Sequence, residues 1–129
     1  MSARVLIADD EPSIAMSLEF LLGISGYTTR VASDGEEALS VARQFQPDLI
    51  VLDLMLPRLS GLEVCRTLRA DPQQCSVKVL MLTARGATAD LERGRAAGVD
   101  AYQVKPFSTQ DLLSQVRRLL TTGSQNHAQ

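Results

Sequence analysis

The residues best suited to chemistry in this sequence are carboxylates that follow short apolar runs. Asp9 and Asp10 come directly after Val5–Ala8, and Asp53 closes the run Leu49–Leu52. Neighbouring carboxylates raise one another's pKa values unless a cation holds them ionised. Mg²⁺ suits this role because it prefers oxygen ligands and needs only one or two protein carboxylates. We therefore predict a magnesium site here, which Mn²⁺ can also occupy.

Two further polar residues follow apolar runs in the same way. Thr83 ends Lys78–Leu82, and Lys105 follows Ala101–Val104. A partly hydrated cation beside a free carboxylate suits phosphoryl transfer, which depends on positioning and on neutralising charge. Asp53 is then the expected nucleophile and forms an acyl phosphate. Lys105 and Thr83 are expected to contact the phosphoryl oxygens.

Each of these residues alone has a structural explanation. Asp10 could start a helix, Thr83 could cap one, and Asp53 could simply end a strand. All five polar groups, however, stand at the corresponding end of an apolar run. That coincidence favours a shared site over five separate structural roles.

The segments that carry these groups alternate with segments of helical period. Three apolar runs are nearly continuous in Val, Leu and Ile, as strands covered on both faces are, whereas Thr28–Ala32 is mixed and suits a sheet edge. Capping residues precede three of the helical segments, at Asp34, Ser60 and Ser108. The alternation predicts an α/β fold, a doubly wound sheet of five parallel strands with five helices. Such a sheet collects the strand ends at one rim.

The segment Gly86–Ala97 is the least convincing helix. Its apolar residues are mostly alanine, and Gly94 interrupts it. We expect it to be the loosest of the five helices. Two interpretations stay open, an element that moves in function or a small-residue helix packed close to the sheet.

Length, charge and cysteine spacing limit the classes of protein to which this sequence can belong. The 129 residues suit one domain, which we place at residues 1–121, with a disordered tail or the start of a linker at 122–129. A net charge of -2 gives no basic surface for direct nucleic-acid binding, and no apolar run approaches the ~20 residues of a membrane span. Cys65 and Cys75 have neither zinc nor redox-pair spacing. We expect a cytoplasmic protein with reduced thiols.

Four segments together resemble the signature of the response-regulator receiver domain of bacterial two-component signalling: IADDEP, VLDLMLPRLSG, MLTARG and AYQVKPF. They stand in the family's order and spacing from Arg4 to about Leu120. The resemblance implies the CheY-like, flavodoxin-like fold with strand order 2-1-3-4-5. It also implies a sensor histidine kinase or a histidine phosphotransfer protein as phosphodonor. Such a domain is a signalling module that catalyses its own phosphorylation and dephosphorylation, not an enzyme.

The resemblance assigns roles around the rim. It makes Asp53 the phosphoacceptor, and it adds the backbone carbonyl of Met55 to the metal ligands Asp9, Asp10 and Asp53. The peptide bond between Lys105 and Pro106 is often cis in similar proteins.

The resemblance also implies a switch. Thr83 moves toward the phosphoryl group, and the ring of Tyr102 moves into the vacated space. Phosphorylation thereby shifts the populations of two conformations. The fourth helix, fifth strand and fifth helix then signal to a downstream effector protein or a fused output domain.

Receiver domains of dimeric transcription factors typically carry charged residues that form ion pairs across the dimer interface. This sequence differs from them at several of those positions. Leu91 and Gln115 stand where basic residues are usual, and Asp100 is followed by Ala101 instead of a second acid. Arg93, Arg117 and Arg118 are possible substitutes. We therefore predict a monomer or a weak dimer.

Two residues are expected to tune the lifetime of the acyl phosphate. Met55 and Arg85 each lie two positions beyond a key residue of the rim, Asp53 and Thr83. Their bulk and charge would control the entry of attacking water.

Three other functions share part of this pattern. A phosphatase of the haloacid-dehalogenase type also uses an aspartyl phosphate, but Met55 replaces its second acid and a cap domain is missing. A nucleotide-binding module would carry a G-x-G-x-x-G run after the first strand, and this sequence has no such run there. A receiver-like interaction module that is not regulated by phosphorylation should have lost one of the acids or the lysine, and all are present.

Overall fold

The computed structural model describes residues 3–84 and 88–128. Strands and helices alternate in the order β1 (Arg4–Ala8), α1 (Pro12–Ile24), β2 (Thr28–Ala32), α2 (Gly35–Phe45), β3 (Leu49–Asp53), α3 (Gly61–Ala70), β4 (Lys78–Ala84), α4 (Thr88–Ala97), β5 (Ala101–Lys105) and α5 (Thr109–Ala128). All strand pairs are parallel, in the order β2-β1-β3-β4-β5. The predicted fold and strand order are confirmed.

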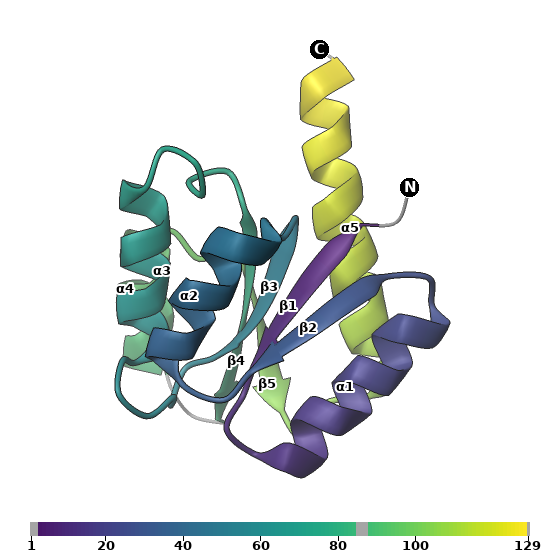
Figure 1. Ribbon diagram of the computed structural model, residues 1–129, viewed down its shortest axis with the longest axis horizontal. Helices are drawn as coiled ribbons and strands as arrows, with labels where there is room; N and C mark the ends of the chain where they lie inside the picture. Colours follow the sequence, from purple (N-terminus) through teal and green to yellow (C-terminus); the bar gives the residue numbers. More distant parts are fainter. Residues whose placement is uncertain (1–2, 85–87, 129) are drawn as a thin grey trace.

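The helices cover the sheet on both faces. Figure 1 shows α2, α3 and α4 on one side and α1 with α5 on the other. Alternate residues of a strand point to opposite faces, so β1 sends Val5 and Ile7 toward α1 and α5, and Leu6 and Ala8 toward α2 and α3. Every residue of β3 is buried, whereas β2 is partly exposed. The central and edge strands are therefore those that the sequence predicts.

Predicted capping residues start three of the helices. The Asp34 carboxylate accepts the Glu37 N–H at 2.7 Å, and Ser60 forms a reciprocal capping box with Glu63. Ser108 accepts the Asp111 N–H at 3.0 Å. These contacts satisfy backbone donors that the first turn of a helix leaves unpaired.

The last helix is longer than expected. Apolar periodicity ends near Leu120, and we expected disorder over 122–129, but α5 continues to Ala128. Residues 121–128 contain no proline and one glycine, so nothing in this segment prevents the backbone hydrogen bonds from propagating. The domain boundary at residue 121 stays a prediction.

None of the described helices combines the length and the hydrophobicity that crossing a membrane requires.

Candidate functional site

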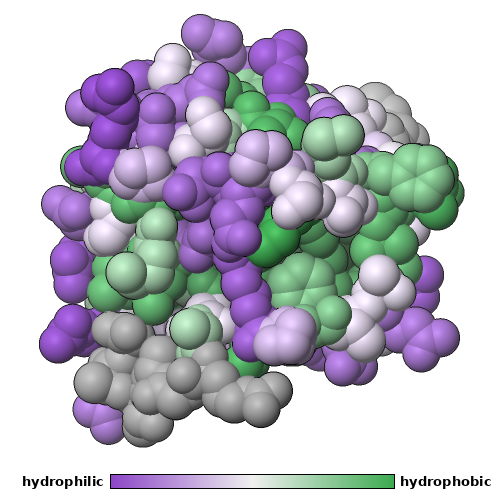
Figure 2. Space-filling view, turned by 90° about the horizontal axis from the view of Figure 1, so that it is seen from below, coloured by the Kyte–Doolittle hydropathy of each residue, from purple (hydrophilic) through white to green (hydrophobic). Residues whose placement is uncertain are grey.

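The parallel sheet brings the predicted site residues to one edge. Asp9 follows β1, Asp53 ends β3, and Lys105 ends β5. Thr83 lies one residue before the end of β4, directly opposite Val104. Figure 2 looks onto this edge, where hydrophilic surface over the middle of the molecule meets hydrophobic surface on the side of α1. Helix α1 has three exposed large hydrophobic side chains, Met16, Phe20 and Ile24.

Three carboxylates converge at the rim. Ligand atoms of Asp9, Asp10 and Asp53 lie within 4.8 Å of one another. Asp9 and Asp53 are buried, whereas Asp10 is exposed. Oxygen donors at this spacing, two buried and one open to solvent, fit a hard divalent cation that keeps part of its water shell.

Lys105 joins the carboxylates. Its Nζ lies 3.2 Å from Asp9 Oδ2, 3.2 Å from Asp53 Oδ2 and 3.4 Å from Glu11 Oε1. One ammonium therefore bridges the ends of β1, β3 and β5. Sequence reasoning missed Glu11, although its position directly after Asp10 was a usable signal.

The pKa values of Asp9 and Lys105 move in the same direction for different reasons. Burial raises the pKa of Asp9, and the nearby Asp53 charge adds to that effect. Burial alone would lower the pKa of Lys105, but the carboxylates of Asp53 and Asp9 outweigh it and raise that pKa above its usual value. The cluster therefore favours a bound positive charge.

Backbone amides hold the remaining carboxylate oxygens. Asp9 Oδ1 accepts the Glu11 N–H at 2.9 Å, and Asp53 Oδ1 accepts the Met55 N–H at 3.1 Å. Each buried carboxylate thus gives one oxygen to the backbone and the other to Lys105. The Met55 side chain is exposed beside Asp53.

Thr83 and Tyr102 lie on the same face of the sheet. Tyr102 pairs with Met81, two residues from Thr83, so the two side chains are diagonal neighbours on adjacent strands. Thr83 is buried, and among the described residues its hydroxyl donates a long hydrogen bond of 3.4 Å to the Ala84 carbonyl. Its hydroxyl can therefore turn toward another acceptor at little cost.

Two other expectations concern single positions. The Lys105–Pro106 peptide bond is cis, as the family resemblance implied. Arg85 lies outside the described residues, so its effect on the lifetime of an acyl phosphate stays a prediction.

Comparisons with known proteins identify the family. The model of the response regulator receiver domain matches residues 5–117. The DNA-binding response regulator MtrA of Mycolicibacterium smegmatis is 44% identical over 120 residues, covering 93% of this chain and 51% of that protein. The DNA-binding dual master transcriptional regulator RpaA of Synechocystis is 44% identical over 117 residues, covering 91% and 48%. This chain thus spans about half the length of these curated relatives.

Solved structures agree in fold. A putative response regulator from Chloroflexus aurantiacus superposes with a TM-score of 0.89 at 36% identity, covering 94% of this chain and 99% of that one. The chemotaxis response regulator CheY4 of Vibrio cholerae gives 0.88 at 33% identity, covering 92% and 99%. Together with the rim of acids and the strand order, these matches show that the chain belongs to the response regulator receiver domain family of two-component systems.

Proposed function

We propose that this receiver domain accepts a phosphoryl group on Asp53 in a reaction that requires Mg²⁺. The observation that carries the proposal is the convergence of Asp9, Asp10 and Asp53 with Lys105 in contact with Asp53. The donor is a sensor histidine kinase or a histidine phosphotransfer protein. This domain works in the cytoplasm as a signalling module, not as an enzyme on other substrates.

The metal site would be built from Asp9, Asp10, Asp53 and the backbone carbonyl of Met55. A bound Mg²⁺ supplies positive charge beside the oxygens of the transferred group. The three converging carboxylates support this assignment, and so does the raised pKa of Asp9, because buried like charges need a counterion.

Asp53 is the nucleophile. One of its carboxylate oxygens is held by the Met55 N–H, and the other faces Lys105. In the transfer, a bond forms between a carboxylate oxygen and phosphorus while the bond from phosphorus to the donor histidine breaks. The Lys105 ammonium stays beside the group and offsets its charge.

Thr83 and Tyr102 are the residues that would change position in the switch. The long hydrogen bond of the Thr83 hydroxyl is easily exchanged for one to a phosphoryl oxygen. Tyr102 lies diagonally across on β5, next to the space that Thr83 would leave. The resulting population shift would alter the surface of α4, β5 and α5.

The output is a downstream effector protein or a fused output domain. MtrA and RpaA are DNA-binding regulators, and this chain matches about half of each. The net charge of -2 argues against direct DNA contact by the receiver itself.

The test is intact-mass measurement after incubation with acetyl phosphate, with and without Mg²⁺. We expect one phosphoryl group on the wild type only with Mg²⁺, and none on Asp53→Asn. Asp111→Asn, an exposed carboxylate on the first turn of α5, is the matched control and should behave like the wild type.

Two outcomes would contradict the proposal. Phosphorylation of Asp53→Asn to the wild-type level would remove Asp53 from the reaction. Intact Mg²⁺ binding without any uptake, from acetyl phosphate and from phosphorylated histidine phosphotransfer protein alike, would favour an interaction module that works by contact alone.

A further inference from the structure

Gly94 occupies an unusual place for a glycine, the buried side of α4. Glycine disfavours helix because it loses more backbone entropy on folding than other residues. In the part of α4 whose side chains are described, only Gly94 and Ala97 are buried. The helix therefore approaches the sheet through its smallest residues.

The tip of the Tyr102 ring fills the space that a side chain at position 94 would need. A Cβ atom added to Gly94 would overlap Tyr102 Oη and would lie 2.8 Å from Cζ and 3.3 Å from Cε1. These three nearest atoms all belong to Tyr102. Contacts this short cannot persist, so a side chain here would require either the ring or the helix to move.

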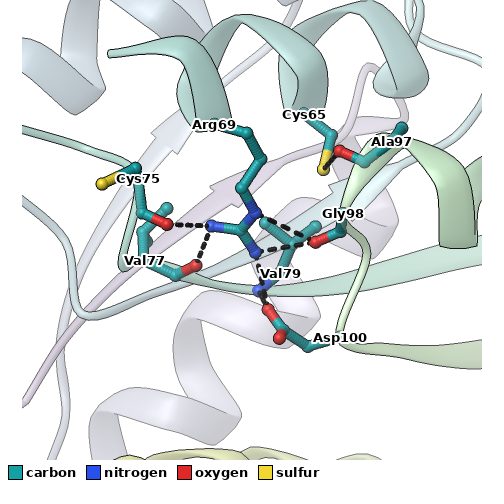
Figure 3. A network of polar contacts seen from close by, with 8 residues as sticks. All are labelled: Cys65, Arg69, Cys75, Val77, Val79, Ala97, Gly98 and Asp100. Carbon is teal, nitrogen blue, oxygen red and sulfur yellow. Dashed lines mark hydrogen bonds and ion pairs between the residues drawn. The ribbon is translucent and has the colours of Figure 1, made fainter. Parts of the chain in front are cut away.

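The C-terminal end of α4 is not free to move away. Figure 3 shows Cys65 Sγ donating to the Ala97 carbonyl at 3.3 Å, and Arg69 donating to the Gly98 carbonyl through Nε at 3.0 Å and Nη2 at 2.8 Å. Asp100, directly before β5, also binds Arg69. The end of α4 is thus tied to α3, which limits how far this helix can move away from the ring.

We propose that Gly94 is a positioning residue for Tyr102: the space left by its missing side chain seats the hydroxyl end of the ring against α4. Any larger residue at position 94 expels the ring into another rotamer. We call this space beside Gly94 the seat of the ring, and it is a property of the folded chain. Its consequence for signalling rests on the proposed function, because it makes position 94 a determinant of how α4 and the switch aromatic are coupled.

The sequence provides a direct probe of the ring. The protein has no tryptophan and two tyrosines, Tyr27 and Tyr102. In a Tyr27→Phe background, intrinsic fluorescence therefore reports on Tyr102 alone. Acrylamide quenching of that fluorescence measures the exposure of the ring.

Gly94→Ala is compared with Gly23→Ala in this background. Gly23 is also helical, in α1, and an added Cβ there meets no atom within 4 Å. We expect Gly94→Ala to raise the quenching constant about twofold because the ring turns to a rotamer away from α4. Gly23→Ala should leave the constant unchanged. An unchanged constant in folded Gly94→Ala would overturn the proposal.

Thermal unfolding gives an independent readout. Alanine normally stabilises a helix relative to glycine, so Gly23→Ala should raise Tm. Gly94→Ala should lower it, and the loss should shrink when Tyr102→Phe removes the closest atom, Oη. If Gly94→Ala does not fold alone, recovery of folding in the Tyr102→Phe background supports the seat, and failure to recover it overturns the seat.

A third measurement separates this inference from the proposed function. Acetyl phosphate with Mg²⁺ should change the Tyr102 fluorescence of the Tyr27→Phe protein, and the change should be smaller with Gly94→Ala. Absence of phosphorylation in both proteins would refute the proposed function and leave the seat standing on its quenching result. Equal changes in two phosphorylated proteins would refute the role of position 94 in signalling.

Discussion

The guanidinium of Arg69 on α3 lies 2.8 Å from the carboxylate of Asp100, just before β5. Asp100 Oδ2 also accepts the Val79 N–H at 2.7 Å. Arg69 donates in addition to backbone carbonyls of three residues, shown in Figure 3: Cys75, Val77 and Gly98. One planar, charged group thus joins α3 to the segments before β4 and β5, next to the C-terminal end of α4.

Arg69→Ala should be strongly destabilising. The substitution leaves three backbone carbonyls without this donor and Asp100 without its charged partner, and hydrogen bonds to charged groups contribute about 1.5–3 kcal/mol each. Both side chains are partly exposed, at 22% and 28%, so we expect a total loss of about 2–3 kcal/mol. Urea unfolding measures it.

The controls for this experiment lie on the same helix and at the same position. Arg66→Ala removes an exposed arginine of α3 and should change the free energy of unfolding by no more than about 0.5 kcal/mol. Arg69→Lys should recover only part of the loss, since an ammonium lacks the planar fork. Equal effects at positions 66 and 69 would show that the network in Figure 3 contributes little.

Lys105→Gln should strengthen Mg²⁺ binding. The ammonium lies 3.2 Å from oxygens of both Asp9 and Asp53, so it competes with a cation for the same charge. Its removal should lower the Kd for Mg²⁺ by about tenfold, given the size of Coulomb interactions at this distance near a protein surface. Calorimetric titration measures the change. Lys78→Gln, at the opposite end of β4, is the control and should leave the Kd for Mg²⁺ unchanged. An equal change in Kd from both substitutions would show that only the net charge of the protein matters.

Asp9→Asn should stabilise the metal-free protein in a way that depends on pH. The pKa of Asp9 is raised in the folded state, chiefly by burial, so ionisation of Asp9 disfavours folding. Below the ordinary pKa of 3.8 the carboxyl is protonated in both states and the variants should be equally stable. As pH rises through the folded pKa, the wild type should lose stability relative to Asp9→Asn. Thermal unfolding in chelator from pH 3 to 8 tests this, and a difference that stays constant with pH would contradict it.

The elements and the acidic rim could be predicted because their signals are local. Strands were marked by continuous apolar runs, and helix starts by capping residues such as Asp34 and Ser60. Parallel alternation then required that Asp9, Asp53 and Lys105 share one edge, without any knowledge of side-chain contacts.

Contacts between distant segments were not accessible in the same way. Asp100 was considered from the sequence as part of a dimer surface, yet it faces Arg69, which lies 31 positions away along the chain. From the sequence, Gly94 belonged either to an element that moves or to a small-residue helix packed close to the sheet, and neither interpretation placed Tyr102 against it. The first contact depends on how α3 packs against the segment before β5, and the second on how α4 packs against β5, which residue spacing alone does not encode.

The oligomeric state provides the last prediction. Gln115 stands where similar receivers carry a basic residue, and its side chain is engaged within the chain: Nε2 donates to the Tyr102 carbonyl at 3.2 Å, and Oε1 accepts from Arg118 at 2.6 Å. Asp100 is engaged by Arg69. A symmetric dimer through α4, β5 and α5 would have to break these contacts or form without them.

We therefore expect the protein to sediment as a monomer at about 0.1 mM, a concentration at which only contacts stronger than about 5–6 kcal/mol would show. This should hold with Mg²⁺ alone and with Mg²⁺ plus beryllofluoride, which mimics the phosphoryl group. The variant Gln115→Arg restores a base to this surface and should associate more strongly. A wild-type dimer at low micromolar concentration would contradict the prediction, and it would mean that the remaining arginines of α4 and α5 replace the missing charges.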